Sequence, residues 1–280
     1  MKRSGGSGPG WPSFPPRSTT RRRGPSGKWV LRASSVPNAD KANEALAELI
    51  RYSLVDYDAQ SDRYELHDLA RLFADSRMEE QERNATQASH AQHFCDVLAE
   101  AGDLYLAGHE QIKAGLALFD RERANIEAGM AWAASRMEAG GQAAELCVEY
   151  PNAGAYVLQL RLHPREQIRW LETQLAAARR LQRRDHEGNA LGNLGDSYFK
   201  LGEARKAIEF CEQHLAIARE IGDRRGEGIA LENMAEALDG LGERGRAVEC
   251  AEAALKIRED IEDPRAAKVR ERLAEWRGQS

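Results

Sequence analysis

The sequence has no long hydrophobic run and few aromatic residues. No stretch approaches the ~18 consecutive apolar residues that a membrane-spanning helix needs. The basic residues near the start are not followed by the apolar segment of a secretory signal. Phe, Trp and Tyr make up 6% of the 280 residues, and charged residues make up 30%. The composition therefore predicts no membrane segment and favours exposed helical surface over a thick sheet core.

Cysteine is scarce, and its spacing excludes the common paired motifs. Four cysteines lie among helix-forming residues and none belongs to a C-x-x-C pair: Cys95, Cys147, Cys211 and Cys250. This usage favours buried free thiols and a cytoplasmic location. His90 and His93 lie near Cys95, but Cys95 falls on another helix face and no second ligand pair follows. We therefore expect no metal and no other cofactor.

A nucleotide-binding loop is also missing from the sequence. The motif G-x-x-x-x-G-K-[ST] supplies backbone amides and a Lys to phosphates. The one Gly-Lys pair, Gly27-Lys28, is instead followed by Trp29. No nucleophile elbow of the G-x-S-x-G kind is present either. The sequence therefore predicts a protein without catalytic activity.

Residues 1–36 differ in composition from the rest of the chain. They are rich in Gly, Pro and Ser and carry eight Lys or Arg but no acidic residue, whereas the whole chain has 45 Asp and Glu. Such a segment cannot build a packed core, so we expect a disordered basic tail. Three interpretations stay open: a solvated tail, a tail that contacts nucleic acid or the acidic body, and a mis-assigned start.

The clearest positive feature is a forty-residue repeat. Residues 184–223 recur as residues 224–263, with the same residue type forty positions later for Gly188, Ala190, Leu191, Asn193, Leu201, Gly202, Glu203, Ala207, Glu209, Leu215 and Ile217. A period of this size predicts stacked supersecondary units, each too small to bury its apolar face alone. We expect residues 143–183 to be a degenerate third copy, whose first helix is unusual in carrying Pro151, Gly154 and Pro164.

Turn residues predict that each copy is a helical hairpin. Gly202 and Gly242 are placed to end the first helix of each copy in a left-handed conformation. Gly222 separates the two copies in the same way. Asp263 and Pro264 then predict a cap and a first helical position. A helix over 264–277 would cover the exposed end of the stack, so the repeat region is expected over 143–280.

Residues 37–77 predict a helix, a short two-stranded hairpin and a second helix. The first helix is expected over 40–52, from apolar residues at helical spacing. The hairpin is expected from apolar residues on either side of a polar turn at 59–62: Leu54, Tyr57, Tyr64 and Leu66. Asp68 is placed to cap the second helix. Residues 78–142 predict a connector of successive helices.

The repeats resemble the tetratricopeptide repeat family. Large, small, aromatic and small residues stand at that family's spacing at Leu194, Gly195, Tyr198 and Ala207. The second copy departs at the aromatic position, with Met234, Ala235, Leu238 and Ala247. The resemblance implies an α-solenoid whose first helices line a concave groove. It also implies that this groove binds a protein or an extended peptide.

Residues 52–74 resemble the winged helix of NB-ARC-type signalling ATPases. In that family a Met-His-Asp or Leu-His-Asp motif approaches the bound ADP, and the matching residues here are Leu66, His67 and Asp68. The resemblance implies a fragment or relative of such an ATPase, with His67 and Asp68 as nucleotide-sensor candidates. Because the P-loop is missing, the simpler interpretation is a histidine at a strand end and an aspartate that caps a helix.

Helical phasing within the first resemblance assigns the residues that line the groove. These are Asn189, Gly192, Asn193, Asp196, Phe199 and Lys200 in one copy, and Ile229, Glu232, Asn233, Glu236 and Asp239 in the next. Asn side chains can hydrogen-bond a peptide backbone in either direction, and the acidic members favour a basic partner. The alternative interpretation is a solvated face on a short spacer.

Together these features predict a mainly α protein with a partial winged helix, a helical connector and a tetratricopeptide-like α-solenoid. We expect a non-catalytic protein-interaction or sensor module, whose few repeats also allow self-association. The alternative is a DNA-binding regulator that uses the winged helix or the basic tail. The near-balanced charge of helix 40–52 makes nucleic acid the less favoured partner.

Overall fold

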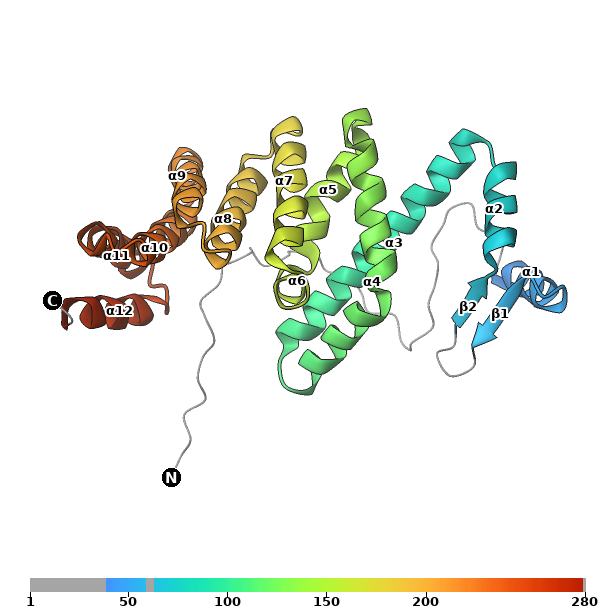
Figure 1. The fold of residues 1–280 in the computed structure, drawn as a ribbon, viewed down its shortest axis with the longest axis horizontal. Coiled ribbons are helices and arrows are strands. Elements are labelled where there is room, and N and C mark those ends of the chain that lie inside the picture. The colour runs from blue at the N-terminus through green and yellow to red at the C-terminus, as the bar shows by residue number, and fades with distance from the viewer. Residues whose placement is uncertain (1–38, 59–62, 279–280) are drawn as a thin grey trace, which may run out of the picture. The chain divides into compact units, whose positions relative to one another are not determined.

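The computed structural model describes residues 39–58 and 63–278, and these form two units (Figure 1). The first unit comprises the described residues up to His90, and the second begins at Ala91. The predicted basic tail at 1–36 and the predicted polar turn at 59–62 lie outside the described residues. Each unit is described by itself below.

The first unit contains a helix, a hairpin and a second helix. Helix α1 (Ala39–Arg51) is followed by strands β1 (Val55–Asp58) and β2 (Arg63–Leu66) and by helix α2 (Asp68–Arg77). The strands are antiparallel, with Tyr57 opposite Tyr64 and their ring centroids 4.9 Å apart. Cross-strand aromatic pairs of this kind stabilise a hairpin, and the predicted hairpin is confirmed.

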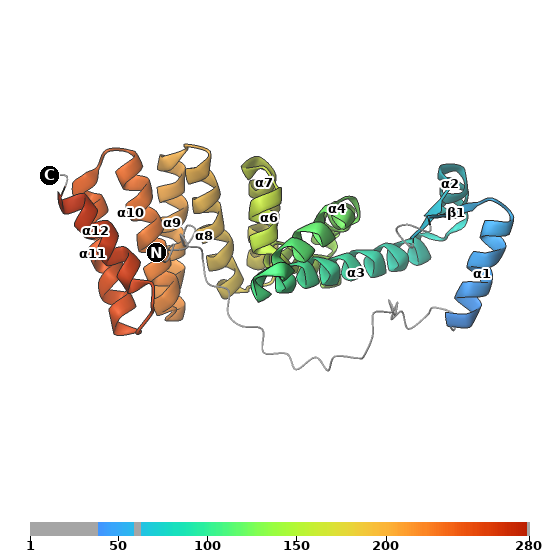
Figure 2. The same ribbon diagram turned by 90° about the horizontal axis from the view of Figure 1, so that it is seen from below.

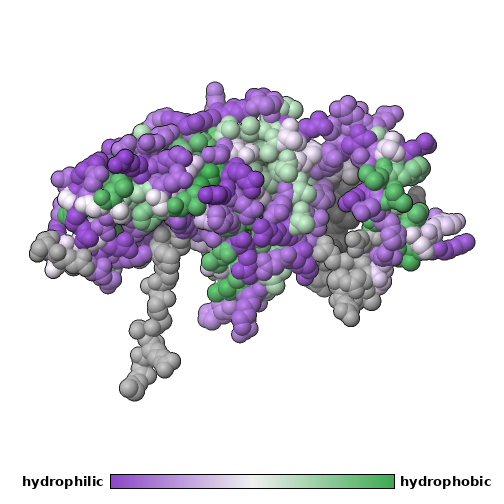
Figure 3. All heavy atoms as spheres, in the orientation of Figure 1, coloured by the Kyte–Doolittle hydropathy of each residue, from purple (hydrophilic) through white to green (hydrophobic). Residues whose placement is uncertain are grey.

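The apolar side chains of α2 remain largely exposed. None of its residues is buried, and Leu69, Leu72 and Phe73 are each more than 60% exposed. Figure 3 shows these hydrophobic side chains gathered over α2. Most helices in proteins are stabilised by the burial of an apolar face. This helix therefore gains little stability from packing within the described part of its unit.

The second unit begins with two long helices that pack against the start of the solenoid. Helix α3 (Glu80–Ala107) begins in the first unit and continues into the second, where α4 (Glu110–Arg136) and a short 3₁₀ helix (Met137–Ala139) follow. The Tyr150 hydroxyl donates a hydrogen bond of 2.7 Å to the carbonyl oxygen of Ala91. Both residues are fully buried, so this bond fixes α3 against the next hairpin.

The degenerate third copy forms three helices instead of two. Its first half is split into α5 (Gly141–Ala153) and α6 (Ala155–Arg161), and its second half is α7 (Pro164–Arg180). A Cβ atom at Gly154, between α5 and α6, would lie 2.3 Å from the Leu98 side chain. A larger residue at this break would therefore require the Leu98 side chain to shift. The oddity that the sequence shows at Pro151 and Gly154 is therefore a real interruption of the first helix.

The two clear copies form two helical hairpins, a final helix follows them, and all of these lie side by side in Figures 1 and 2. The helices are α8 (Arg184–Lys200), α9 (Ala204–Ile221), α10 (Arg224–Gly240), α11 (Arg244–Asp260) and α12 (Ala266–Gly278). Each packs against the next along the chain. The prediction of a mainly α fold with an α-solenoid is confirmed. Across the described residues, no helix combines the length and apolar character needed to cross a membrane.

The turns of the hairpins follow the predicted glycines. Gly202 and Gly242 have φ values of +80° and +78°, and Gly222, which ends α9, has φ +73°. This left-handed conformation is strained for residues with a Cβ atom. The last helix begins two residues later than predicted, at Ala266, although the Asp263 carboxylate accepts a hydrogen bond of 2.9 Å from the Arg265 amide as a cap.

A buried glutamate joins each clear copy to the preceding helix. Glu187 accepts hydrogen bonds of 2.8 Å from Arg179 on α7 and 2.5 Å from Arg184. Burial alone would raise the pKa of Glu187, but the two guanidinium groups outweigh it and lower the pKa. Forty residues later, Glu227 is held in the same way by Arg219 and Arg224. The repeat therefore includes the ion pairs that join each copy to the preceding helix.

Candidate partner-binding face

Helices α8 and α10, the first helices of the two clear copies, contact each other directly. We call the surface that they form the first-helix face. It carries the positions that the sequence assigns to a groove. The polar residues Asn189 and Asn233 are half-buried on these two helices.

Several acidic groove candidates are already paired within the chain. Asp196 and Lys200 form an ion pair at 3.0 Å on α8. Burial raises the pKa of Asp196 to about 6, although Lys200 acts in the opposite direction. On α10, the Arg272 guanidinium of α12 lies 2.9 Å from Glu236, and Arg244 lies 2.6 Å from Asp239. These partners reduce the charge that the face presents to a ligand.

At least two predicted lining residues are buried within the stack, Ile229 and Gly192. Ile229 is only 5% exposed, because its side chain packs into the stack instead of facing solvent. Phe199 is half-buried, and a Cβ atom at Gly240 would lie 3.2 Å from its ring. Phe199 therefore fills space between α8 and α10 and has limited free surface.

The two copies differ in one buried polar side chain that sequence reasoning missed. In the first copy His214 on α9 is buried against glycines of α8 and α10, and a Cβ atom at Gly192 would lie 2.8 Å from its Nδ1. Glu232 stands forty residues after Gly192, and it accepts two hydrogen bonds from the fully buried Arg258 on α11. Arg258 also donates to Asp263 at 2.6 Å. Glu232 is therefore a structural partner of Arg258.

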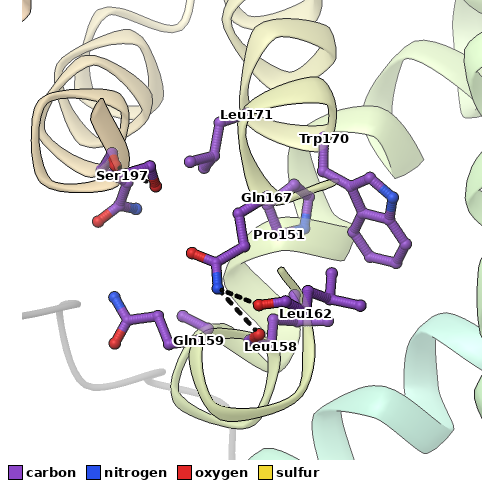
Figure 4. A pocket seen from close by; sticks show the side chains of 10 residues that line it. Pro151, Leu158, Gln159, Leu162, Gln167, Trp170, Leu171 and Ser197 are labelled. Carbon is purple, nitrogen blue, oxygen red and sulfur yellow. Dashed lines mark hydrogen bonds between the residues drawn. The ribbon is translucent and has the colours of Figure 1, made fainter. Parts of the chain in front are cut away.

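A small cavity lies where the interrupted helix meets the first clear copy. It is lined by residues of α5, α6, α7 and α8 and of the α6–α7 turn: Pro151, Ala155, Leu158, Gln159, Leu162, Gln167, Trp170, Leu171, Asn193 and Ser197. Figure 4 shows Gln159 of α6 and Ser197 of α8 facing the same open space. Of the predicted groove residues, only Asn193 belongs to this lining. The break after α5, already indicated by Pro151 and Gly154, was the signal that could have located it.

The nucleotide-sensor candidates lie at the start of α2 in the first unit. The Nε2 atom of His67 is 3.4 Å from Asp56, and both side chains are well exposed. Asp68 is the first residue of α2, and its carboxylate accepts a hydrogen bond of 2.7 Å from Arg71. The predicted cap by Asp68 is wrong, because the N-cap position belongs to His67 and carries no side-chain cap bond.

No metal-binding cluster is present among the described residues, since no three His, Cys, Asp or Glu side chains converge there. The cysteines are free thiols, and three of them are buried. Burial raises the pKa of Cys147 to about 11 and that of Cys211 to about 12. Thiols with raised pKa values are poor nucleophiles at neutral pH.

Comparison with solved structures finds helical repeat proteins. One is a signal transduction ATPase of the STAND class with a tetratricopeptide repeat sensor from Pyrococcus horikoshii, at 16% identity and TM-score 0.42. The match covers 80% of this chain and 47% of that one, so this chain spans about half of that protein's length. Another is a kinesin light chain-like repeat protein from Podosopora anserina, at 18% identity and TM-score 0.42, covering 72% and 90%.

Comparison at the level of sequence identifies the repeats. A search of curated proteins finds no match. Residues 186–260, however, match the model of the tetratricopeptide repeat family. This segment comprises most of α8 and all of α9, α10 and α11. The two clear helical hairpins are therefore tetratricopeptide repeats.

Proposed function

We propose that this protein is a non-catalytic interaction module whose first-helix face binds an extended peptide or a peptide-like segment of a protein partner. The observation that carries this proposal is the Asn193 carboxamide. Asn193 is 7% exposed, and its Oδ1 atom has no hydrogen-bond partner among the described residues. A buried amide without a partner costs free energy, so a ligand that supplies a hydrogen bond would be favoured.

The repeat supplies a second carboxamide in the same position. Asn233 lies forty residues after Asn193 and is half-buried on α10. Two carboxamides on adjacent helices can bond the alternating N–H and C=O groups of an extended chain, because each offers a donor and an acceptor. The packing of α8 against α10 sets the distance between the two carboxamides, so the ligand would run across these two helices.

The ion pairs within the chain limit the charge that we expect on the ligand. Glu232, Glu236 and Asp239 each have an arginine partner within the chain, so they give limited support to a basic partner. We favour a ligand that is held mainly by its backbone and by uncharged side chains. Self-association through the same face is the related alternative for a stack with so few repeats.

The proposed role is that of a sensor in a signalling assembly. The helix, hairpin and helix of the first unit, with Leu66, His67 and Asp68 at the junction of β2 and α2, support kinship with NB-ARC-type ATPases. We propose a cytoplasmic location, supported by four free cysteines. In the absence of a P-loop, we expect no ATP hydrolysis by the purified chain. Turnover that exceeds the rate of the His67→Ala variant would contradict this view.

The peptide-binding proposal is tested by selection from a displayed library of random twelve-residue peptides on the immobilised full chain. We expect binders whose affinity falls at least five-fold in the Asn189→Ala, Asn233→Ala double variant. Lys256→Ala, an exposed change on α11, is the matched control and should leave the affinity unchanged. Failure to select any peptide, or equal loss in both variants, would contradict binding at the first-helix face.

A further inference from the structure

The cavity between α6, α7 and α8 has an uncharged lining. Its residues are Pro151, Ala155, Leu158, Gln159, Leu162, Gln167, Trp170, Leu171, Asn193 and Ser197, so aliphatic and aromatic surface is combined with three carboxamides and one hydroxyl. A charged side chain that entered would lose hydration without meeting an opposite charge, at considerable cost. The lining therefore favours an uncharged ligand group.

Two polar groups of the lining are already used within the protein. The Nε2 atom of Gln167 donates hydrogen bonds to the carbonyl oxygens of Leu158 at 3.2 Å and Leu162 at 3.0 Å, as the dashed lines in Figure 4 show. The Ser197 hydroxyl donates to the carbonyl oxygen of Asn193 at 2.9 Å. The Oδ1 atom of Asn193 is buried without a partner in the described chain. The Asn193 carboxamide therefore has an acceptor that no group of the described chain uses.

The size of the cavity limits what can enter. Its volume is about 30 Å³, whereas a single water molecule needs roughly 10–15 Å³ on the same measure. This room is small, so we expect only the end of one aliphatic side chain to enter it.

We propose that this cavity holds one branched aliphatic side chain of the peptide, with the Asn193 carboxamide hydrogen-bonded to the adjoining peptide group. The inference rests on the proposed function and adds the chemistry of one ligand position. That position lies where the first helix of the degenerate copy is split into α5 and α6. Val, Leu and Ile are the residues expected there.

The test begins with peptides selected from the same library on the full chain. We expect Val, Leu or Ile at one fixed position in the selected sequences. A synthetic peptide with that residue replaced by Phe, Asp or Lys should bind at least ten-fold more weakly. Selected peptides with a charged or aromatic residue at every fixed position would overturn the inference while leaving the proposed function intact.

Matched variants then locate that side chain. Ala155→Leu fills the cavity from the first residue of α6, whereas Ala176→Leu adds the same side chain at an exposed site on α7. We expect the first change to weaken binding at least ten-fold and the second to leave it unchanged, with similar thermal unfolding. Asn193→Ala should weaken binding about five-fold or more. Full affinity in Ala155→Leu would overturn the cavity inference alone; no selected peptide would overturn both proposals.

Discussion

At the scale of the residue, one buried position distinguishes the successive copies. The positions forty residues apart are Gln174, His214 and Ala254, and all three side chains are buried. His214 fits because Gly192 leaves space on α8, where a Cβ atom would lie 2.8 Å from its Nδ1. The sequence predicted Gly188 as a repeat position and assigned Gly192 to the groove, but it did not predict the histidine packed against them. Burial of a polar side chain depends on the neighbouring helices, which no local spacing reveals.

The buried histidine predicts a specific dependence of stability on pH. Burial lowers the pKa of His214 from its ordinary 6.5 to about 4, although the Asp223 carboxylate acts in the opposite direction. Between pH 6.5 and 4 the unfolded chain therefore binds more protons than the folded chain, and stability falls as pH falls. The loss is about 3 kcal/mol at 1.36 kcal/mol per pKa unit. His214→Gln, which copies Gln174, should remove it.

Urea unfolding of both proteins between pH 7 and 4 measures this effect. Asp196, whose raised pKa acts with the opposite sign over part of this range, is present in both proteins. Its contribution therefore cancels in the difference between them. An identical decline of the free energy of unfolding in the parent and in His214→Gln would mean that His214 is accessible to protons in the folded state.

At the scale of the element, the sequence predicts most helices because their ends carry local signals. Gly202 and Gly242 mark the hairpin turns at the positions where the structure has them. The split of the first helix into α5 and α6 was less predictable, because Pro151 lies inside α5 and the break falls at Gly154. That break is fixed by close contact with Leu98, a residue far away in the sequence.

The hairpin turn gives a prediction with a matched control. A Cβ atom at Gly242 meets nothing within 4 Å, so Gly242→Ala tests only the cost of φ +78°. We expect a loss of about 1–2 kcal/mol in the free energy of unfolding. Gly245 on α11 is equally unobstructed but has an ordinary φ. Gly245→Ala should therefore raise stability by up to about 1 kcal/mol.

Thermal or urea unfolding of the two glycine variants measures the change in the free energy of unfolding at each position. Opposite signs are expected, since the same methyl group is added at two open sites that differ only in backbone conformation. Destabilisation of equal size at both positions would show that the loss at Gly242 does not come from its left-handed conformation.

At the scale of the whole molecule, the sequence predicts the stack of hairpins more securely than the chemistry of its surface. Asn193 lies on the predicted face, yet Glu232 and Glu236 are tied to Arg258 and Arg272. Arg272 comes from α12, beyond the repeats, so helical phasing within one copy could not show that this charge is neutralised. Apart from Asn193, the residues of the cavity were likewise missed, since most of them come from α5, α6 and α7 of the degenerate copy.

The central claim, that a partner binds along α8 and α10, is tested most directly by site-specific photocrosslinking. The full chain carries benzoylphenylalanine in place of the exposed Lys200 on α8 or, as the control, in place of the exposed Lys256 on α11. After irradiation with a labelled peptide selected on the parent chain, we expect a covalent adduct from position 200 and none from position 256. An adduct from position 256 alone, or equal yields from both positions, would contradict the account.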